Sequence, residues 1–163
     1  MIRKSFEIAL KKGEVGEQIA RNILEGKGWV VYQPVTAGPH CFDMVAIKDK
    51  RSAIALDVKA KARMNYYPAT GIDQKHFEEY QNFSNKHQMP FWLVFVDEMQ
   101  KTVYGNSLDQ LEKPLVIGKV QYPKRVGAQR IWPLCAMKHI ATLDCDSVAK
   151  LLEYNQRTHA YTA

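Results

Sequence analysis

Two acids and a lysine stand in stretches that are otherwise apolar, and their types suit metal binding and phosphate chemistry. Residues 54–61 alternate between apolar and polar, which puts Asp57, Lys59 and Lys61 on one strand face. The preceding apolar run carries a single acid, Asp43. A buried carboxylate without a partner is unfavourable, so Asp43 either lies at the open end of its strand or faces a cation. If the two strands are neighbours, one metal ion satisfies both Asp43 and Asp57.

The helix predicted before these strands supplies a third acid. At about 100° per residue, Glu17 projects at the border of the apolar arc of this helix. Glu14, by contrast, projects toward solvent. We therefore expect Glu17 to face the sheet and to join the other two acids.

Each of these residues also has an interpretation without chemistry. Asp57 can belong to an exposed strand face, and Glu17 can be a half-exposed helix acid. Asp43 can end its strand in a turn, and Lys59 can simply form an ion pair with one of the acids. The joint pattern is less easily explained in this way, so it favours a functional site.

The elements around these residues predict one α/β domain over residues 1–163, with a core at about 5–105 and a basic accessory region at about 106–163. Helices are expected over 5–25, 73–87 and 147–154, a loop over 65–71, and strands over 29–35, 42–47, 53–60, 91–96 and 102–104. One or two further strands are expected in the basic region. The helix between the third and fourth strands can supply a crossover, so the order predicts a mixed central sheet flanked by helices.

Asp43 followed by Asp57-Val58-Lys59 resembles the core motif of the PD-(D/E)XK nuclease superfamily. The segment Gly13 to Glu17, the 73–80 helix and the strand after Pro90 are similar to the branch of archaeal Holliday-junction resolvases. The resemblance covers roughly residues 10–105 and implies a restriction-endonuclease-like αβββαβ core. Phe42 stands where the motif has proline, and Asp57 stands where many members have glutamate.

This resemblance implies hydrolysis of phosphodiester bonds in DNA with Mg²⁺ or Mn²⁺ as cofactor, because carboxylates with retained waters suit these ions. It makes Asp43 and Asp57 metal ligands and Glu17 a ligand or a water-mediated partner. It also makes Lys59 the group that holds the attacking water and stabilises negative charge in the transition state. Gln74 matches a position where relatives often direct a polar residue toward the site.

The net charge of +6 points to a polyanionic partner. Between positions 113 and 143 there are six basic residues and no acid, so all of the net charge lies in that stretch, although a merely soluble basic surface would look the same. We expect contacts with DNA from a basic loop around Gly127 that contains Lys124, Arg125 and Arg130, and from Lys61 on the strand face of Asp57. Tyr66 and Tyr67 can either stack on a splayed base or cap the core.

The three cysteines have no paired spacing, and the sequence contains neither a signal peptide nor an apolar run long enough to span a bilayer. A cytoplasmic location with no membrane partner is therefore expected. A zinc site formed by Cys135, His139 and Cys145 is conceivable, but the spacing favours ordinary buried thiols.

The leading hypothesis is a structure-selective DNA endonuclease. Its resemblance to the resolvases, which are dimers, allows a homodimer, and no small-molecule cofactor is expected. A second hypothesis is a noncatalytic nucleic-acid-binding subunit that keeps the nuclease fold. A third is a nuclease for RNA or single strands, because a metal site does not distinguish sugars and no reader of the ribose hydroxyl is evident.

Overall fold

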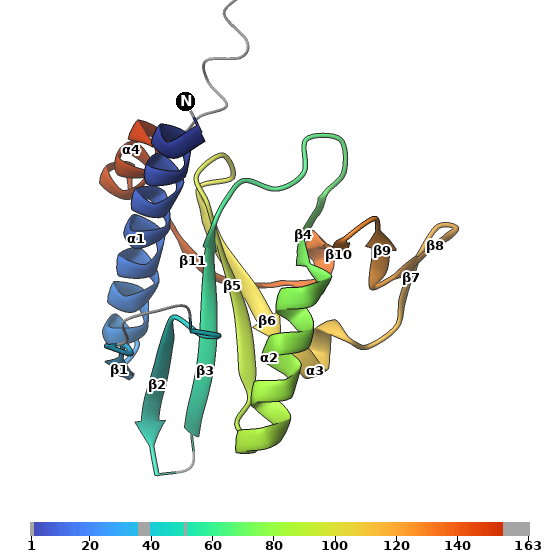
Figure 1. Ribbon diagram of the computed structural model, residues 1–163, viewed down its shortest axis with the longest axis horizontal. Coiled ribbons are helices and arrows are strands. Elements are labelled where there is room, and N and C mark those ends of the chain that lie inside the picture. The colour runs from blue at the N-terminus through green and yellow to red at the C-terminus, as the bar shows by residue number, and fades with distance from the viewer. Residues whose placement is uncertain (1, 36–39, 51, 155–163) are drawn as a thin grey trace, which may run out of the picture.

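A six-stranded sheet lies at the centre of the computed structural model, which describes residues 2–35, 40–50 and 52–154. Strands β3 and β5 are parallel and all other neighbours are antiparallel, so the expected mixed sheet is confirmed (Figure 1). Its strand order is β1 (Val30–Tyr32), β2 (Met44–Asp49), β3 (Ser52–Ala60), β5 (Phe91–Asp97), β6 (Thr102–Ser107) and β11 (Lys138–Thr142).

Helices cover both faces of this sheet. The long helix α1 (Ile2–Gly26) and the closing helix α4 (Cys145–Glu153) lie together on one face, where they share an aliphatic core with Leu56 and Val58 (Figure 1). Helix α2 (Gln74–His87) packs with an aromatic core on the other face, together with the short helix α3 (Leu108–Leu111). Successive side chains of β3 point to opposite faces of the sheet, so Leu56 and Val58 join the first core and Ala55 joins the second.

Local signals explain where the two main helices end. Helix α1 ends at Gly26, and Gly28 follows with φ of +85°, a conformation that favours glycine. Helix α2 ends before Gln88, which adopts the left-handed conformation, and Pro90 stands two residues later. Both helices match the predicted ranges to within a few residues.

The remaining described strands form two small sheets, of which the first packs against α2. One contains β4 (Ala69–Asp73), β10 (Gln129–Pro133) and β9 (Lys124–Val126), and the other is the hairpin of β7 (Leu115–Ile117) and β8 (Val120–Tyr122). A 3-10 turn over Leu134–Ala136 leads from β10 toward β11. The prediction of a loop over 65–71 is thus wrong from Ala69 onward, because pairing with β10 makes β4 a strand. The described part of the basic region, as far as residue 154, holds five strands rather than one or two.

The cysteines are free, and two of them differ from the expectation of buried thiols. Cys135 and Cys145 are exposed, whereas Cys41 is partly buried. Among the residues that the structure describes, no three or more His, Cys, Asp or Glu side chains are grouped to hold a metal, so Cys135, His139 and Cys145 do not form a zinc site. None of the described helices has the length and apolar character needed to cross a membrane.

Candidate active site

Strand β3 has an unpaired edge, and the candidate site lies along it. Strand β2 pairs with β3 only as far as Leu56, so among the described strands β5 alone pairs with β3 from Asp57 to Ala60. Asp43, directly before β2, covers this edge: its backbone N–H donates to the Leu56 carbonyl at 2.9 Å. Its Oδ2 accepts a hydrogen bond from the Val58 N–H at 2.6 Å. The Asp43 carboxylate is therefore fixed beside the Asp57-Val58-Lys59 motif.

Asp57 is buried and paired with Lys59. The Lys59 Nζ donates to Asp57 Oδ1 at 2.9 Å and lies 2.8 Å from Oδ2. The ammonium group also lies 6.0 Å from the centre of the Tyr80 ring, which α2 contributes from the aromatic core. Burial raises the pKa of Asp57 to about 6 and outweighs Lys59, which lowers it; repulsion from Asp43 raises it further.

Glu17 lies in an open cleft of about 480 Å³ between α1 and the free edge of β3, together with Asp43 and Lys59. Helix α1 approaches β3 closely here, since a Cβ added at Gly16 would lie only 2.6 Å from the Cβ of Ala60. Glu17 is partly buried while Glu14 is exposed, as helix geometry predicts. We call this cavity the acidic cleft.

Negative charge is concentrated at the acidic cleft. Burial, followed by repulsion from Asp43 and from Asp57, raises the pKa of Glu17 to about 7, while His40 acts in the opposite direction. The three acids thus lie within electrostatic range of one another. An excess of carboxylate charge of this kind fits a divalent cation in chemical type.

The acids are not, however, already gathered around one point. Within the described ranges, no group of three or more potential ligand side chains stands close enough to hold an ion. Asp57 also has its carboxylate engaged by Lys59, the ion-pair role considered above as an alternative. Since Mg²⁺ commonly uses one or two carboxylates and completes its shell with water and phosphate, Asp43 and Asp57 suffice in number.

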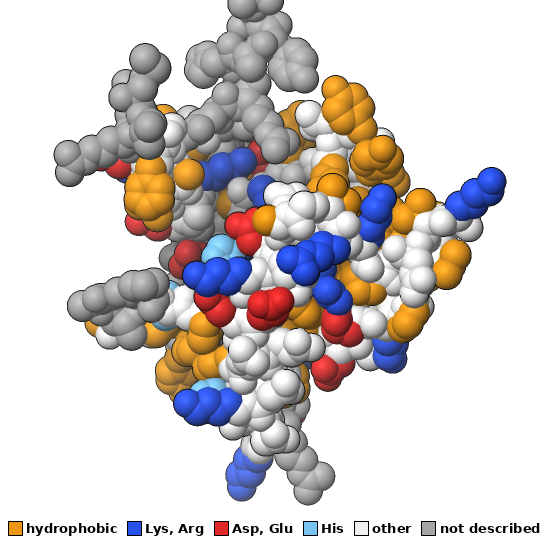
Figure 2. All heavy atoms as spheres, turned by 45° about the vertical axis from the view of Figure 1, so that its right-hand side comes forward, with side chains coloured by type: hydrophobic (Ala, Val, Ile, Leu, Met, Phe, Trp, Pro, Cys, Tyr) orange, Lys and Arg blue, Asp and Glu red, His pale blue; other side chains and the backbone are white. Residues whose placement is uncertain are grey.

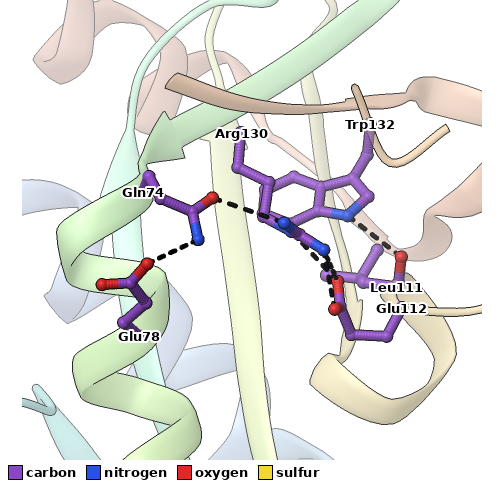
Figure 3. Close-up of polar contacts among 6 residues, drawn as sticks. All are labelled: Gln74, Glu78, Leu111, Glu112, Arg130 and Trp132. Atoms are coloured by element: carbon purple, nitrogen blue, oxygen red, sulfur yellow. Dashed lines mark hydrogen bonds and ion pairs between the residues drawn. The ribbon is translucent and has the colours of Figure 1, made fainter. Parts of the chain in front are cut away.

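Gln74 lies in a different polar network, at the start of α2 (Figure 3). Its Nε2 donates to Glu78 at 2.9 Å, and its Oε1 accepts from Arg130 at 3.3 Å. Arg130 is itself paired with both carboxylate oxygens of Glu112, at 2.5 and 2.6 Å, and stacks over the Phe77 ring at 4.5 Å. The expectation that Arg130 belongs to a free basic loop is therefore corrected: it joins β10 to α2 and to the end of α3.

The loop between β3 and β4 carries two exposed tyrosines, and hydrogen bonds hold its two ends together. Tyr66 and Tyr67 are 88% and 65% exposed, so they do not cap the core. Hydrogen bonds from Met64 N–H to the Ala69 carbonyl and from Leu134 N–H to the Pro68 carbonyl hold the ends of this loop. Lys61, at the start of the segment, donates to the Gly71 carbonyl and lines the acidic cleft.

Lys124 and Arg125 lie on β9 and are exposed. Strand β9 pairs with β10 across a turn at Gly127, where φ of +57° again favours glycine. Figure 2 shows the face that carries the small sheets, where Lys and Arg side chains lie among acidic ones and hydrophobic side chains gather near the edge. Basic groups are thus available on this side of the molecule.

Sequence reasoning did not identify three residues that shape these contacts. Tyr80 faces Asp57 and Lys59 and has its own pKa raised, first by burial and then by Asp57. His40 acts on Glu17, and Glu112 holds Arg130. Tyr80 lies inside the predicted 73–87 helix without any signal of its own, and Glu112 stands immediately before the acid-free stretch.

The structure thus combines a mixed central sheet flanked by helices with an acidic cleft at the free edge of its third strand. Among solved structures, the chain is similar to Hjc, a Holliday junction resolvase from Archaeoglobus fulgidus, with a TM-score of 0.55 and 14% identity over 76% of this chain and 96% of the resolvase. A nuclease from a fusselovirus matches with a TM-score of 0.43 and 13% identity over 88% of this chain and 89% of that one. No family model and no curated protein sequence matches the chain.

Proposed function

We propose that this protein is a metal-dependent DNA endonuclease that selects its substrate by shape, with branched or four-way-junction DNA as the favoured substrate. The observation that carries the proposal is the grouping of Asp43, Asp57 and Lys59 at the unpaired edge of β3, beside an open acidic cleft. The fold that the chain shares with a Holliday junction resolvase supports junction DNA in particular.

The proposed cofactor is Mg²⁺ or Mn²⁺. Asp43 and Asp57 would hold the ion, with Glu17 as a third ligand or a partner through water. Such an ion, when bound, polarises a phosphate oxygen and lowers the pKa of its bound water. Lys59, whose Nζ lies 2.9 Å from Asp57 Oδ1, would stabilise the negative charge that develops on the phosphate and would orient the attacking water.

Affinity for DNA is expected mainly from groups at the rim of the acidic cleft and beyond it, because phosphate contacts dominate nucleic-acid binding. The exposed Lys124 and Arg125 are suited to contact a DNA backbone, and Lys61 lines the acidic cleft where β3 leads into the loop that carries Tyr66 and Tyr67. Tyr66 and Tyr67 offer exposed rings on a loop with a closed base, which suits stacking on unpaired bases. Unpaired or distorted bases occur at branch points, so this loop supports selection by shape.

A second candidate function is a nucleic-acid-binding subunit that does not cleave. The ion pair between Asp57 and Lys59 favours it, because it occupies two groups that cleavage would require. This candidate predicts salt-sensitive binding of DNA with no product in any metal.

The test is a cleavage panel with the wild type, Asp57→Ala, Lys59→Ala and, as a matched control, Lys86→Ala at the exposed end of α2. Substrates are plasmid, linear duplex, single-stranded DNA, single-stranded RNA and a four-way junction, each with Mg²⁺, Mn²⁺ or EDTA. We expect metal-dependent cleavage of the junction by the wild type, with a rate at least about 100-fold lower in the two site variants. Cleavage that survives both substitutions would refute the assignment, and preferred cleavage of RNA would change the substrate.

A homodimer is also proposed, since paired cuts at a junction require two sites. Light scattering of the wild type at micromolar concentration measures this directly. A monomer would remove the paired-cut proposal and would leave single-strand cleavage at the acidic cleft untouched.

A further inference from the structure

A second cavity, of about 270 Å³, lies beside the C-terminal half of α1 and is separate from the acidic cleft. The acidic cleft uses α1 as far as Glu17, whereas this cavity uses α1 from Ala20 to Leu24, together with Lys27 directly after the helix. Its other walls come from the central sheet and from the two tryptophans Trp29 and Trp92, both partly exposed. We call it the apolar pocket.

The apolar pocket combines an apolar floor with a basic rim. Aliphatic side chains such as Ile23, Ile54 and Val94 line its interior, and its only charged or titratable lining residues among those described are Lys27, Lys138 and His139. The Lys138 ammonium lies 5.6 Å from the centre of the Trp92 ring. None of the lining residues is acidic, so the pocket carries a defined positive polarity.

The size and polarity of the apolar pocket restrict what it can bind. Its volume is just below the roughly 300–1,000 Å³ typical of sites for whole small molecules, which suits a single bulky side chain. A nucleobase would lose the hydrogen bonds of its polar edges against an aliphatic floor. An apolar side chain has no hydrogen bonds to lose in the pocket, and carboxylates on either side of it can contact the basic rim.

We infer that the apolar pocket docks a short acidic segment of another protein that inserts one bulky apolar residue between Trp29 and Trp92. Lys27 and Lys138 receive the flanking carboxylates at the rim. Because the pocket and the acidic cleft occupy different parts of α1, such a partner can bind while the cleft is engaged with its substrate. The inference concerns recruitment and does not depend on whether the cleft cleaves DNA.

The test measures binding of a fluorescein-labelled peptide, Asp-Glu-Asp-Gly-Leu-Phe with a free carboxyl end, to the full chain by fluorescence anisotropy. Two control peptides replace either the acids by lysine or the Leu-Phe pair by serine. We expect binding of the first peptide alone, weakened by salt. Equal binding of the serine peptide would show mere charge attraction and would overturn the inference, as would no binding of the first peptide.

Two double variants locate the site. Lys27→Glu with Lys138→Glu reverses the rim, and Lys86→Glu with Lys150→Glu makes the same change in net charge at exposed positions on α2 and α4. The rim variant should bind the peptide roughly tenfold more weakly, and the control less than about twofold, because distant exposed charges are screened. An equal loss in both variants would contradict the assignment to the apolar pocket.

Tryptophan emission supplies an independent signal. The chain has three tryptophans, and Trp132 is already fully buried, so drying of the apolar pocket should shift the emission of Trp29 and Trp92 to shorter wavelength. Trp92→Phe should reduce this shift. If light scattering shows a wild-type dimer that the rim variant dissociates, a second copy of the chain covers the pocket and the inference of an acidic partner is overturned.

Discussion

Replacing Asp57 by asparagine should stabilise the protein at high pH while it removes a proposed metal ligand. Asp57 is 5% exposed, and its pKa rises from an ordinary 3.8 to about 6, mainly because burial disfavours the charged form. At 1.36 kcal/mol per pKa unit, keeping this carboxylate ionised in the folded state costs about 3 kcal/mol. Asparagine has nearly the same shape and carries no charge, so it avoids this cost.

The sign and range of the pH dependence follow from linkage. Because the folded pKa is higher than the unfolded pKa, folding takes up a proton between about pH 4 and pH 6. The stability associated with this proton is present below pH 4 and is lost as pH rises through about 6. The advantage of Asp57→Asn should therefore be about 1 kcal/mol at pH 4.5 and about 3 kcal/mol at pH 8.

The assay is urea unfolding followed by circular dichroism at pH 4.5, 6 and 8, with EDTA present so that no metal compensates the charge. Asp109→Asn, at an exposed position on α3, is the control and should show a difference near zero at each pH. A difference between wild type and Asp57→Asn that stays constant with pH would refute the burial argument. Destabilisation by Asp57→Asn at pH 8 would show instead that the pair with Lys59 is a net stabilising contact.

Three further outcomes are expected. Lys59→Met should lower the rate of junction cleavage at least about 100-fold while the dissociation constant for DNA changes little. The reason is that this ammonium acts mainly on charge that develops in the transition state. An equal loss of rate and affinity would assign Lys59 to binding. Gly16→Ala should lower the free energy of unfolding, measured by chemical denaturation, by about 1–3 kcal/mol, because the new Cβ would lie 2.6 Å from Ala60 Cβ. Gly13→Ala is the control: its Cβ meets nothing within 4 Å, so it should stabilise α1 by about 0.5–1 kcal/mol. The double variant Lys124→Glu and Arg125→Glu should weaken DNA binding across all sequences and lower the salt slope of binding by about 2, measured by anisotropy from 50 to 200 mM salt; an unchanged slope would exclude β9 from the DNA interface.

The core elements could be predicted from the sequence because their signals are local. The apolar period of α1 and the continuous apolar run of β5 are each sufficient to define an element without knowledge of the rest of the chain. Strand β4 could not be predicted, because its sequence Ala-Thr-Gly-Ile-Asp has little strand propensity of its own. It is a strand because it pairs with β10, from Ala69 opposite Pro133 to Asp73 opposite Gln129.

The same distinction holds at the candidate site. The spacing of Asp43 and Asp57 and the helical angle of Glu17 predicted three acids near one ion. In the structure Glu17 and Asp43 both line the acidic cleft, while Asp57 is paired with Lys59. The partners of each group depend on tertiary contacts, so sequence reasoning did not foresee Tyr80 beside Asp57. It also could not show that Glu112 neutralises Arg130, because the ion pair depends on how α3 meets β10.

The central claim is that Asp43 and Asp57 together bind a divalent cation, and a titration with Mn²⁺ followed by electron paramagnetic resonance tests it most directly. The signal of free Mn²⁺ falls as the ion binds, so the wild type at pH 7.5 should remove about one ion per chain, and Mg²⁺ should compete for it. The double variant Asp43→Asn and Asp57→Asn should leave the free signal nearly unchanged. Equal binding of Mn²⁺ by the wild type and by this variant, or no binding by either, would contradict the metal site on which the proposed cleavage depends.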